Sequence, residues 1–176
     1  VPALANIDGA SFDVSGGVTL SIPLATSYTH TAGTNPYDVM FKATGTGSVI
    51  DLRNVTSITN GLGYANSVNI SALSGGAVDL RSVTQIVDPT GGDTRWRRVN
   101  LLADGVGSSL NFAALTNFND VYSGGTSGDA IYSTIVAKNS GQINAPLLAS
   151  LIGVYVTLNG TGTFPVGQMT TFEDGR

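Results

Sequence analysis

The chain has 176 residues, of which 41% are hydrophobic and only 11% are charged, with 23 glycines, no cysteine and a net charge of −4. This composition supplies a buried core for one globular domain, and it excludes a disordered tail, disulfides and thiolate metal sites. The acidic balance argues against a general attraction to nucleic acid or to an anionic membrane, and no apolar run reaches the ~20 residues that span a bilayer.

A nine-residue repeat dominates the sequence: apolar, Asp or Asn, apolar, two free positions, apolar, usually Thr, one free position, apolar. An imperfect copy, which we interpret as one residue shorter between its apolar positions, occupies residues 20–28. Further copies occupy residues 50–58, 78–86, 110–118, 143–151 and 164–172. Units that recur at such intervals and cannot bury an apolar face alone are typical of solenoids.

Each coil also contains a shorter apolar-x-apolar unit, separated from the long repeat by a glycine step. The short units are residues 12–14, 39–41, 68–70, 99–101 and 156–158. The long copies begin at residues 50, 78, 110, 143 and 164, so the minimum coil is about 21 residues and the rest is insertion. The sequence therefore predicts an all-β fold, a single-stranded right-handed parallel β-helix (solenoid) of about six coils with loop insertions at one corner. Leucine-rich repeats are excluded because no helical return segment is present.

Stacked coils are expected to align equivalent positions into ladders at a spacing of ~4.8 Å. Asp51 is predicted to stack on Asp79, and Arg53 on Arg81, with these four side chains facing solvent. Exposed charge pairs of this kind contribute little to stability.

The insertions are predicted at residues 29–37, 59–66, 87–98 and 119–132. All six Phe occupy apolar positions of the strand units, whereas Trp96 and five of the six Tyr lie in or beside the insertions. Because Tyr and Trp combine a flat apolar face with a hydrogen-bonding group, we expect a recognition surface there, although such residues also decorate ordinary loops and Trp96 could simply cover a hydrophobic edge. The candidate ligand-binding residues are Trp96, Tyr64, Tyr122, Arg95, Arg97, Asp93, Asp120, Tyr37 and Tyr132. Sugar hydroxyls would bond to Asp93, Asp120, Asn60 or Asn66.

Catalytic and metal-binding chemistry is weakly represented. His30 is the only His and Glu173 the only Glu, and Asp88, Asp93, Asp120 and Asp129 are expected on loops with no defined separation. No cofactor is predicted, and calcium is possible at Asp120 and Asp129 in a Gly-rich turn. The arginines around Trp96, which are Arg95, Arg97 and Arg98, would suit an anionic polysaccharide and are a weak signal for nucleic acid.

The repeat pattern resembles right-handed parallel β-helix carbohydrate-binding modules of bacterial polysaccharide-degrading enzymes and, more loosely, pectate-lyase-type β-helices. The likeness covers residues from about 10 to 172 and implies a non-catalytic module that recognises a cell-wall polysaccharide, with xylan or another β-glycan as the first expectation. Two alternatives remain: a structural or adhesive segment of a bacterial surface protein, and a polysaccharide lyase or hydrolase-like β-helix.

Residues 1–176 are interpreted as one module excised from a larger secreted or cell-surface protein, where it would be linked to a catalytic domain. Its uncapped edges could form dimers.

Overall fold

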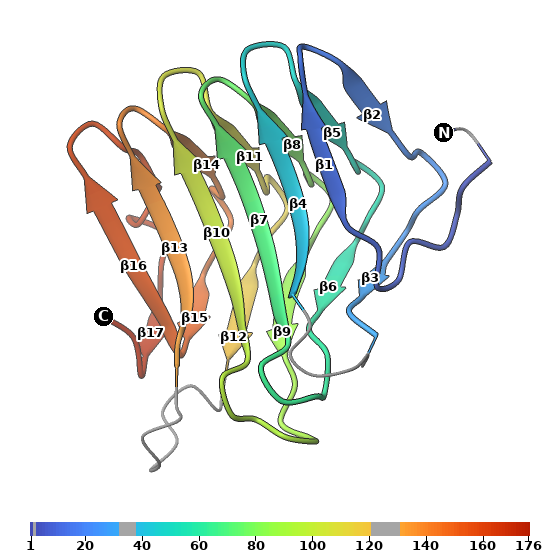
Figure 1. Ribbon diagram of the computed structural model, residues 1–176. Helices are drawn as coiled ribbons and strands as arrows, with labels where there is room; N and C mark the ends of the chain where they lie inside the picture. Colours follow the sequence, from blue (N-terminus) through green and yellow to red (C-terminus); the bar gives the residue numbers. More distant parts are fainter. Residues whose placement is uncertain (2, 32–37, 121–130) are drawn as a thin grey trace.

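The computed structural model describes residues 1, 3–31, 38–120 and 131–176. In these ranges every regular element is a β-strand, seventeen in all, so this part of the chain has no helix that could cross a membrane. Each strand pairs in parallel with its equivalent in the next coil, as Figure 1 shows. The predicted all-β parallel solenoid is confirmed.

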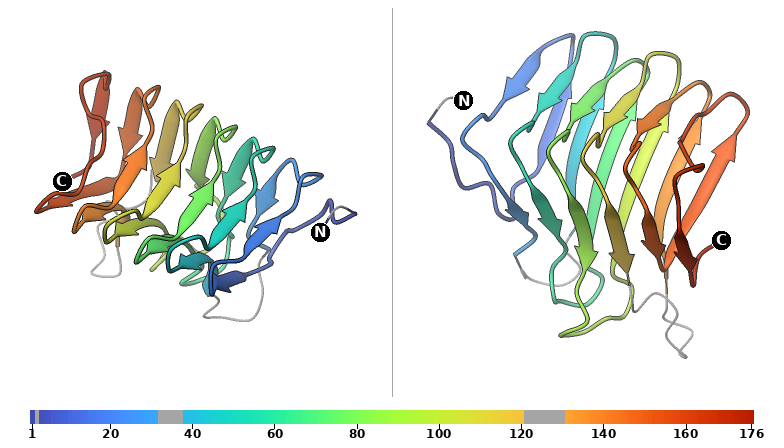
Figure 2. Two further views of the ribbon diagram at one scale, coloured as in Figure 1. Left: turned by 90° about the horizontal axis from the view of Figure 1, so that it is seen from above. Right: turned by 180° about the vertical axis from the view of Figure 1, so that it is seen from behind.

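Three parallel sheets form the walls of the solenoid (Figure 2). Sheet A contains β1 (Phe12–Ser15), β4 (Asp38–Thr44), β7 (Ser67–Leu73), β10 (Arg98–Asp104), β13 (Ser133–Lys138) and β16 (Val154–Asn159). Sheet B contains β2 (Thr19–Ser21), β5 (Val49–Asp51), β8 (Ala77–Asp79), β11 (Ser109–Asn111) and β14 (Gln142–Asn144). Sheet C contains β3 (Tyr28–Thr29), β6 (Ser57–Thr59), β9 (Gln85–Asp88), β12 (Asn117–Asp120), β15 (Ser150–Ile152) and β17 (Thr171–Glu173).

Each coil runs through sheets A, B and C in turn. In Figure 1 the chain rises along sheet A at the front, crosses to sheet B behind it and descends through sheet C, while it advances from right to left; this path is right-handed. Four coils, from β4–β6 to β13–β15, are stacked between two neighbours. The expected count of about six is reached only by including the first and last coils, of which the last has a single isolated bridge, Gln142 to Thr163, in place of a strand of sheet B.

The core is a set of inward columns in which each coil places an apolar residue at the same height. Sheet A contributes a column of alanines, namely Ala43, Ala72, Ala103 and Ala137. Sheet C contributes large side chains, namely Tyr28, Ile58, Ile86, Phe118 and Leu151. Because Tyr28 pairs with Ile58 and Leu20 with Ile50, the copy at residues 20–28 has the full repeat spacing, and the interpretation that it is one residue shorter is wrong.

The charged ladder on the outside of sheet B forms as predicted, since Asp51 pairs with Asp79 in the strand register. Arg53 and Arg81 each bind the aspartate two residues earlier in their own coil. Asp51 is nevertheless buried, because Arg53 covers it and Ser21 donates a hydrogen bond to Oδ2 at 3.0 Å. The prediction of full exposure is therefore wrong for this carboxylate.

Among the aromatic residues in the described ranges, three depart from the predicted division. Phe172 lies in β17, the outermost strand of sheet C, and is 50% exposed. Phe12 in β1, at the other end, is only partly buried. Tyr155 lies on β16 and not in an insertion.

The insertions fall at one corner, between the end of sheet C and the start of sheet A, as predicted (Figure 1, bottom). Five of their boundaries differ from the prediction by one or two residues, because the strands include Thr29, Thr59 and Arg98 and because β9 extends to Asp88 and β12 to Asp120. The fifth connection, between β15 and β16, is Gly153 alone. The two longer connections that the structure describes in full are residues 60–66, between β6 and β7, and residues 89–97, between β9 and β10. These two loops lie next to each other at this corner.

Candidate functional site

The interior of the loop corner is polar, in contrast to the apolar columns elsewhere. Two residues beyond the large side chains of sheet C that point inward, the next inward positions are occupied by His30, Asn60, Asp88 and Asp120. All four are 1–2% exposed. Buried polar groups are stable only when they are hydrogen-bonded or paired, so this column requires internal partners.

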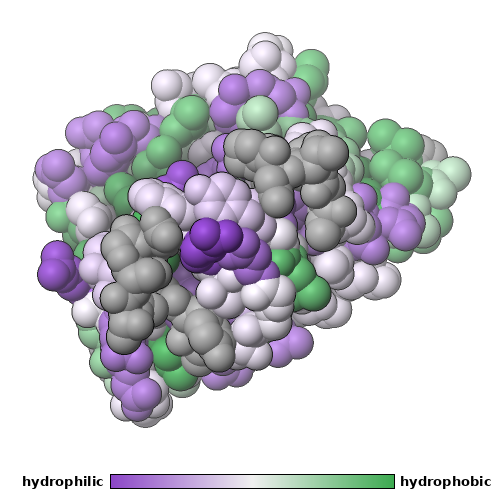
Figure 3. Space-filling view, turned by 60° about the horizontal axis from the view of Figure 1, so that its bottom comes forward, coloured by the Kyte–Doolittle hydropathy of each residue, from purple (hydrophilic) through white to green (hydrophobic). Residues whose placement is uncertain are grey.

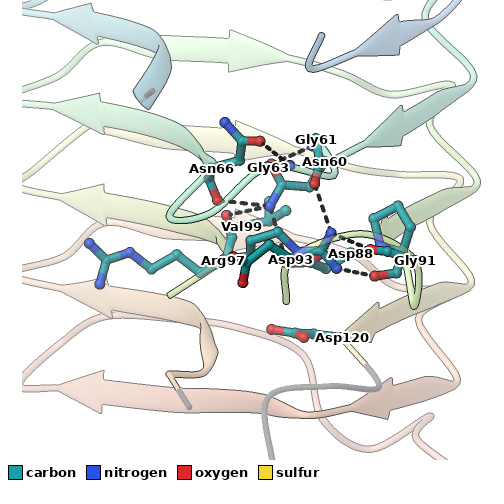
Figure 4. A network of polar contacts seen from close by, with 12 residues as sticks. Asn60, Gly61, Gly63, Asn66, Asp88, Gly91, Asp93, Arg97, Val99 and Asp120 are labelled. Carbon is teal, nitrogen blue, oxygen red and sulfur yellow. Dashed lines mark hydrogen bonds and ion pairs between the residues drawn. The ribbon is translucent and has the colours of Figure 1, made fainter. Parts of the chain in front are cut away.

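Arg97 is the partner of Asp88 in this column and also binds the loops beside it (Figure 4). Its guanidinium donates to the carbonyl oxygens of Gly61 at 3.1 Å and Gly91 at 2.8 Å, and also to that of Pro89. Nη2 lies 2.9 Å from Oδ1 of Asp88, and because no directed hydrogen bond reaches Oδ1, this contact is chiefly an ion pair. Arg97 is itself 2% exposed and therefore ties two successive loops to the interior.

Asn60 connects the remaining members of the column. Its amide nitrogen donates to Oδ2 of Asp88 at 3.1 Å, and its amide oxygen lies 3.1 Å from Nδ1 of His30. Asp120, one coil further on, accepts from the backbone N–H and the hydroxyl of Ser133, at 3.0 and 2.8 Å. Hydrogen bonds thus connect His30, Asn60 and Asp88 across three coils, and Asp120 continues the polar column in the fourth coil with Ser133 as its partner.

Burial raises the pKa of Asp88 to about 7, and the neighbouring charge of Asp120 adds to this effect. Arg97 and the hydrogen bond from Asn60 oppose the rise without cancelling it, because burial of the carboxyl away from water is the largest effect. Burial lowers the pKa of His30, against the opposing effects of Asn60 and Asp38. Charge in this network is therefore sensitive to pH near neutrality.

The loops above the network are stacked on one another by backbone hydrogen bonds. The N–H of Ala65 donates to the carbonyl of Arg95 at 3.0 Å, and the N–H of Asp93 donates to that of Leu62 at 2.9 Å. Since Ser67 pairs with Arg98, Ala65 and Trp96 occupy equivalent positions, two residues earlier in each coil. The two loops thus continue the solenoid beyond its sheets.

Trp96 occupies a left-handed backbone conformation, with φ of 64°, as does Ala65 with φ of 57°. Such a conformation is costly for a bulky residue, and strained residues of this kind cluster at binding and active sites. Trp96 is also 38% exposed. The molecule therefore holds its single Trp in an unfavourable conformation at the surface.

A pocket of about 390 Å³ lies beside Trp96, and its described lining residues are Asp38, Tyr64, Ala65, Ser67, Trp96, Arg98 and Ile131. The guanidinium of Arg95 lies 5.1 Å from the centroid of the Tyr64 ring and forms an ion pair with Asp93 at 2.7 Å. Figure 3 views the corner from the loop side, where hydrophilic and hydrophobic side chains are interspersed. The pocket thus combines two aromatic rings with charged and hydroxyl groups.

A polar ladder extends along the outside of sheet A next to this pocket. Asn100 donates to Oδ1 of Asn69 at 2.8 Å, and Thr134 donates to Oδ1 of Asn100 at 2.9 Å. In the register this ladder continues to Tyr155, whose ring stacks on Tyr132 with centroids 3.8 Å apart. Aromatic rings therefore lie at both sides of a band of hydrogen-bonding side chains.

The predicted site residues divide into three groups. Trp96, Tyr64, Arg95 and Asp93 lie together at the stacked loops, and Tyr132 lies across the polar ladder from them. Arg97 and Asp120 are buried in the network beneath, as are Asn60 and Asn66, so the expectation that these residues face a ligand at the surface is wrong. Tyr37, Tyr122 and Asp129 lie outside the described residues.

The prediction that Asp88 and Asp120 lie on loops is also wrong, because each is the last residue of a sheet C strand. Within the described ranges, no group of three or more His, Asp or Glu residues is placed to hold a metal ion. Asp120, the described member of the calcium pair, is instead bonded to Ser133.

Asp38 and Ser67 line the pocket but are not among the predicted binding residues, and Arg98, which also lines it, was predicted only as one of three arginines that would suit an anionic polysaccharide. They are aligned in the register as the first residues of β4, β7 and β10. One feature of the sequence could have identified these residues: each directly precedes the first inward apolar residue of its sheet A strand. Residues at that position face outward beneath the loops, because side chains alternate along a strand.

A larger pocket, of about 470 Å³, lies on the side of the corner next to His30 and Asn60. Its described lining is mainly Thr29, Thr31, Thr59, Leu62 and Pro89, and it includes no Trp or Tyr. The aromatic pocket is therefore the better candidate for a specific ligand.

A scan against protein-family models, a search of curated proteins and a search of solved structures each found no match to this chain. The assignment of the fold as a parallel β-solenoid rests on the strand pairing described above.

Proposed function

We propose that the protein is a non-catalytic carbohydrate-binding module that holds a polysaccharide against the Trp96 pocket and the adjacent outer face of sheet A. The observation that carries this proposal is Trp96, which is exposed, held at φ of 64°, and placed in one pocket with Tyr64 and Arg98. A strained backbone conformation and an exposed indole ring each cost free energy, and contact between this ring and a ligand would offset that cost.

The chemistry of the surface suits a chain of sugar units. The C–H face of a pyranose ring packs on a flat aromatic ring, and its hydroxyls bond to side-chain amides and hydroxyls. Tyr64 and Trp96 supply rings at the pocket, the ladder of Asn69, Asn100 and Thr134 supplies amide and hydroxyl groups, and Tyr132 supplies a further ring. Because equivalent groups recur from coil to coil, an extended polymer would meet them in succession.

The proposed ligand is xylan or another cell-wall β-glycan. The proposed setting is a secreted or cell-surface protein in which this module is linked to a polysaccharide-degrading domain. No nucleic acid or membrane partner is proposed, since six of the eight Lys and Arg residues already have acidic partners in the described structure.

A structural or adhesive segment of a surface protein is the second candidate, and the C-terminal coil favours it. Val166, Phe172 and Leu158 are exposed there, and β16 and β17 are the outermost strands of their sheets. Such an end pairs readily with another strand or a second copy. This function would need no sugar ligand.

An enzymatic function finds less support. Asp88 and Asp120 are buried in the polar network, and Asp93 is paired with Arg95. A lyase or hydrolase would release product from a glycan and lose that activity when Asp93 is replaced by Asn.

The test is affinity electrophoresis of the purified protein in gels that contain soluble xylan, β-glucan, mannan, pectin or alginate. Trp96→Asn removes the indole ring but leaves a residue that tolerates positive φ, so the fold is expected to persist. We expect at least one glycan to retard the protein and the Trp96→Asn variant to lose that retardation.

The matched control is Phe172→Ser, which removes an exposed aromatic ring at the far end of the solenoid. It should leave the retardation unchanged. An absence of retardation in every gel would refute the proposal and favour the structural function, and so would retardation that Trp96→Asn leaves intact.

A further inference from the structure

The cations of this protein are almost all neutralised by neighbouring carboxylates. Lys42, Arg53, Arg81, Arg95, Arg97 and Lys138 form ion pairs with Asp13, Asp51, Asp79, Asp93, Asp88 and Asp104. Of the eight Lys and Arg residues, this leaves Arg98 and Arg176 without an ion pair to a described residue. Arg176 lies over the ring of Tyr155, at 5.5 Å from its centroid.

Arg98 is the cation of the Trp96 pocket. It is the first residue of β10, lines the pocket with Trp96 and Tyr64, and is only partly exposed. Its Nε atom is buried and has no hydrogen-bond partner in the described structure. A buried N–H without an acceptor is costly, whereas a guanidinium binds a planar pair of anionic oxygens through two parallel hydrogen bonds.

The other two arginines of the Arg95–Arg98 segment are not available for an acidic ligand. Arg95 is engaged with Asp93 and the Tyr64 ring, and Arg97 is buried against Asp88 and three carbonyl oxygens. Anion recognition in this segment would therefore depend on Arg98 alone.

Asp38 provides an opposing charge at the other end of the pocket. It is separated from Arg98 by Ser67, two strands away, which corresponds to about 9.6 Å at an interstrand spacing of ~4.8 Å. An acidic group is thus attracted to the Arg98 end and repelled from the Asp38 end, so the pocket would orient a charged sugar.

We propose that the Trp96 pocket prefers an acidic glycan and that Arg98 binds its carboxylate or sulfate group. This inference rests on the proposed glycan-binding function and specifies its ligand class. The protein carries a net charge of −4, so its overall field disfavours polyanions, and a preference for them would have to come from a local contact.

The experiment compares three soluble polymers with one β-1,4-glucan backbone: hydroxyethyl cellulose, carboxymethyl cellulose and cellulose sulfate. Dissociation constants are measured by isothermal titration calorimetry in a buffer of fixed ionic strength. We expect carboxymethyl cellulose or cellulose sulfate to bind about tenfold more tightly than the neutral polymer, because a charge-assisted hydrogen-bond pair commonly contributes that much. The order of the two acidic polymers distinguishes a carboxylate site from a sulfate site.

The variants isolate the contribution of Arg98. Arg98→Gln should remove the preference, so that the acidic and neutral polymers bind this variant with equal affinity, whereas Asp38→Asn should strengthen binding of the acidic polymers. Arg53→Gln, a matched change of an ion-paired arginine in the connection between β5 and β6, should change nothing.

The outcomes separate this inference from the function on which it rests. Equal affinity for the neutral and acidic polymers, or a preference that survives Arg98→Gln, would overturn the role of Arg98 while glycan binding stands. Failure of all three polymers, together with every glycan of the electrophoresis test, would overturn both.

Discussion

The protonation of Asp88 should make the stability of the solenoid depend on pH near neutrality. The pKa of this carboxyl is about 7 in the folded protein and 3.8 in the unfolded chain. Between these values the folded state binds more protons than the unfolded state, so the free energy of unfolding decreases as pH rises. This contribution is fully present below pH 4 and is lost as pH rises through 7.

The magnitude follows from the same two values. Each unit of pKa difference corresponds to about 1.4 kcal/mol, so the full change of about 3 units is worth about 4 kcal/mol. The interval from pH 6 to pH 8 contains about 1 kcal/mol of that change, because the folded carboxyl releases most of its proton there. His30 acts in the opposite direction below pH 6.5, since burial lowers its pKa and its contribution to stability is lost as pH falls.

The assay is urea unfolding followed by circular dichroism at pH 6, 7 and 8, for the parent protein and Asp88→Asn. The variant keeps the shape of the side chain and the His30 contribution but cannot titrate at position 88. The difference in unfolding free energy between the two proteins should therefore shift by about 1 kcal/mol in favour of Asp88→Asn from pH 6 to pH 8.

Asp93→Asn is the matched control, because Arg95 holds the pKa of Asp93 at about 2, far below this interval. The comparison uses only the change with pH of the difference in unfolding free energy between the two proteins. A constant loss of stability in Asp88→Asn, such as that caused by loss of the ion pair to Arg97, therefore does not affect it. Parallel pH profiles for the parent and Asp88→Asn would refute the assignment of the titrating group.

Two further predictions concern the packing of the coils. Phe118→Ala should lower the free energy of unfolding by about 3–5 kcal/mol, because Phe118 is fully buried between Ile86 and Leu151 of the adjacent coils and its loss leaves a cavity. Urea unfolding checks this value against Val106→Ala, an exposed site that should change stability by less than about 0.5 kcal/mol. Gly76→Ala should cost about 1–3 kcal/mol, because the new Cβ would lie 2.3 Å from the carbonyl oxygen of Ala43 in the previous coil. Gly167→Ala, which meets nothing within 4 Å, should be neutral, and equal melting temperatures for both glycine variants would contradict this account of the turn.

The regular part of the fold was predictable because the repeat carries it explicitly. Ile50, Val78, Leu110 and Ile143 are apolar at one repeat position, and the strand register pairs them in that order. Side-chain alternation then determines which residues face inward. The corner that receives the insertions could also be predicted, since only the spacing between repeats varies there.

The candidate site could be predicted only in part. Trp96 and Tyr64 stand out as polar aromatics in insertions, and the structure places them in one pocket. Asp38 was missed, and Arg98 was not distinguished from Arg95 and Arg97, because Asp38 and Arg98 are aligned through β7, across 60 residues of sequence, and the repeat does not mark outward positions at the start of a strand.

The sequence by itself determined the solenoid, its coil length and its loop corner, because apolar residues that recur at this interval become buried only when successive coils stack on one another. Only the tertiary structure decided which charged residues are neutralised. Arg95, Arg97 and Arg98 are near neighbours in sequence, yet the first pairs with Asp93 at the surface, the second is buried against Asp88, and the third remains without an ionic partner in the described structure. Burial and partner distance set these three outcomes, and both depend on the neighbouring coils.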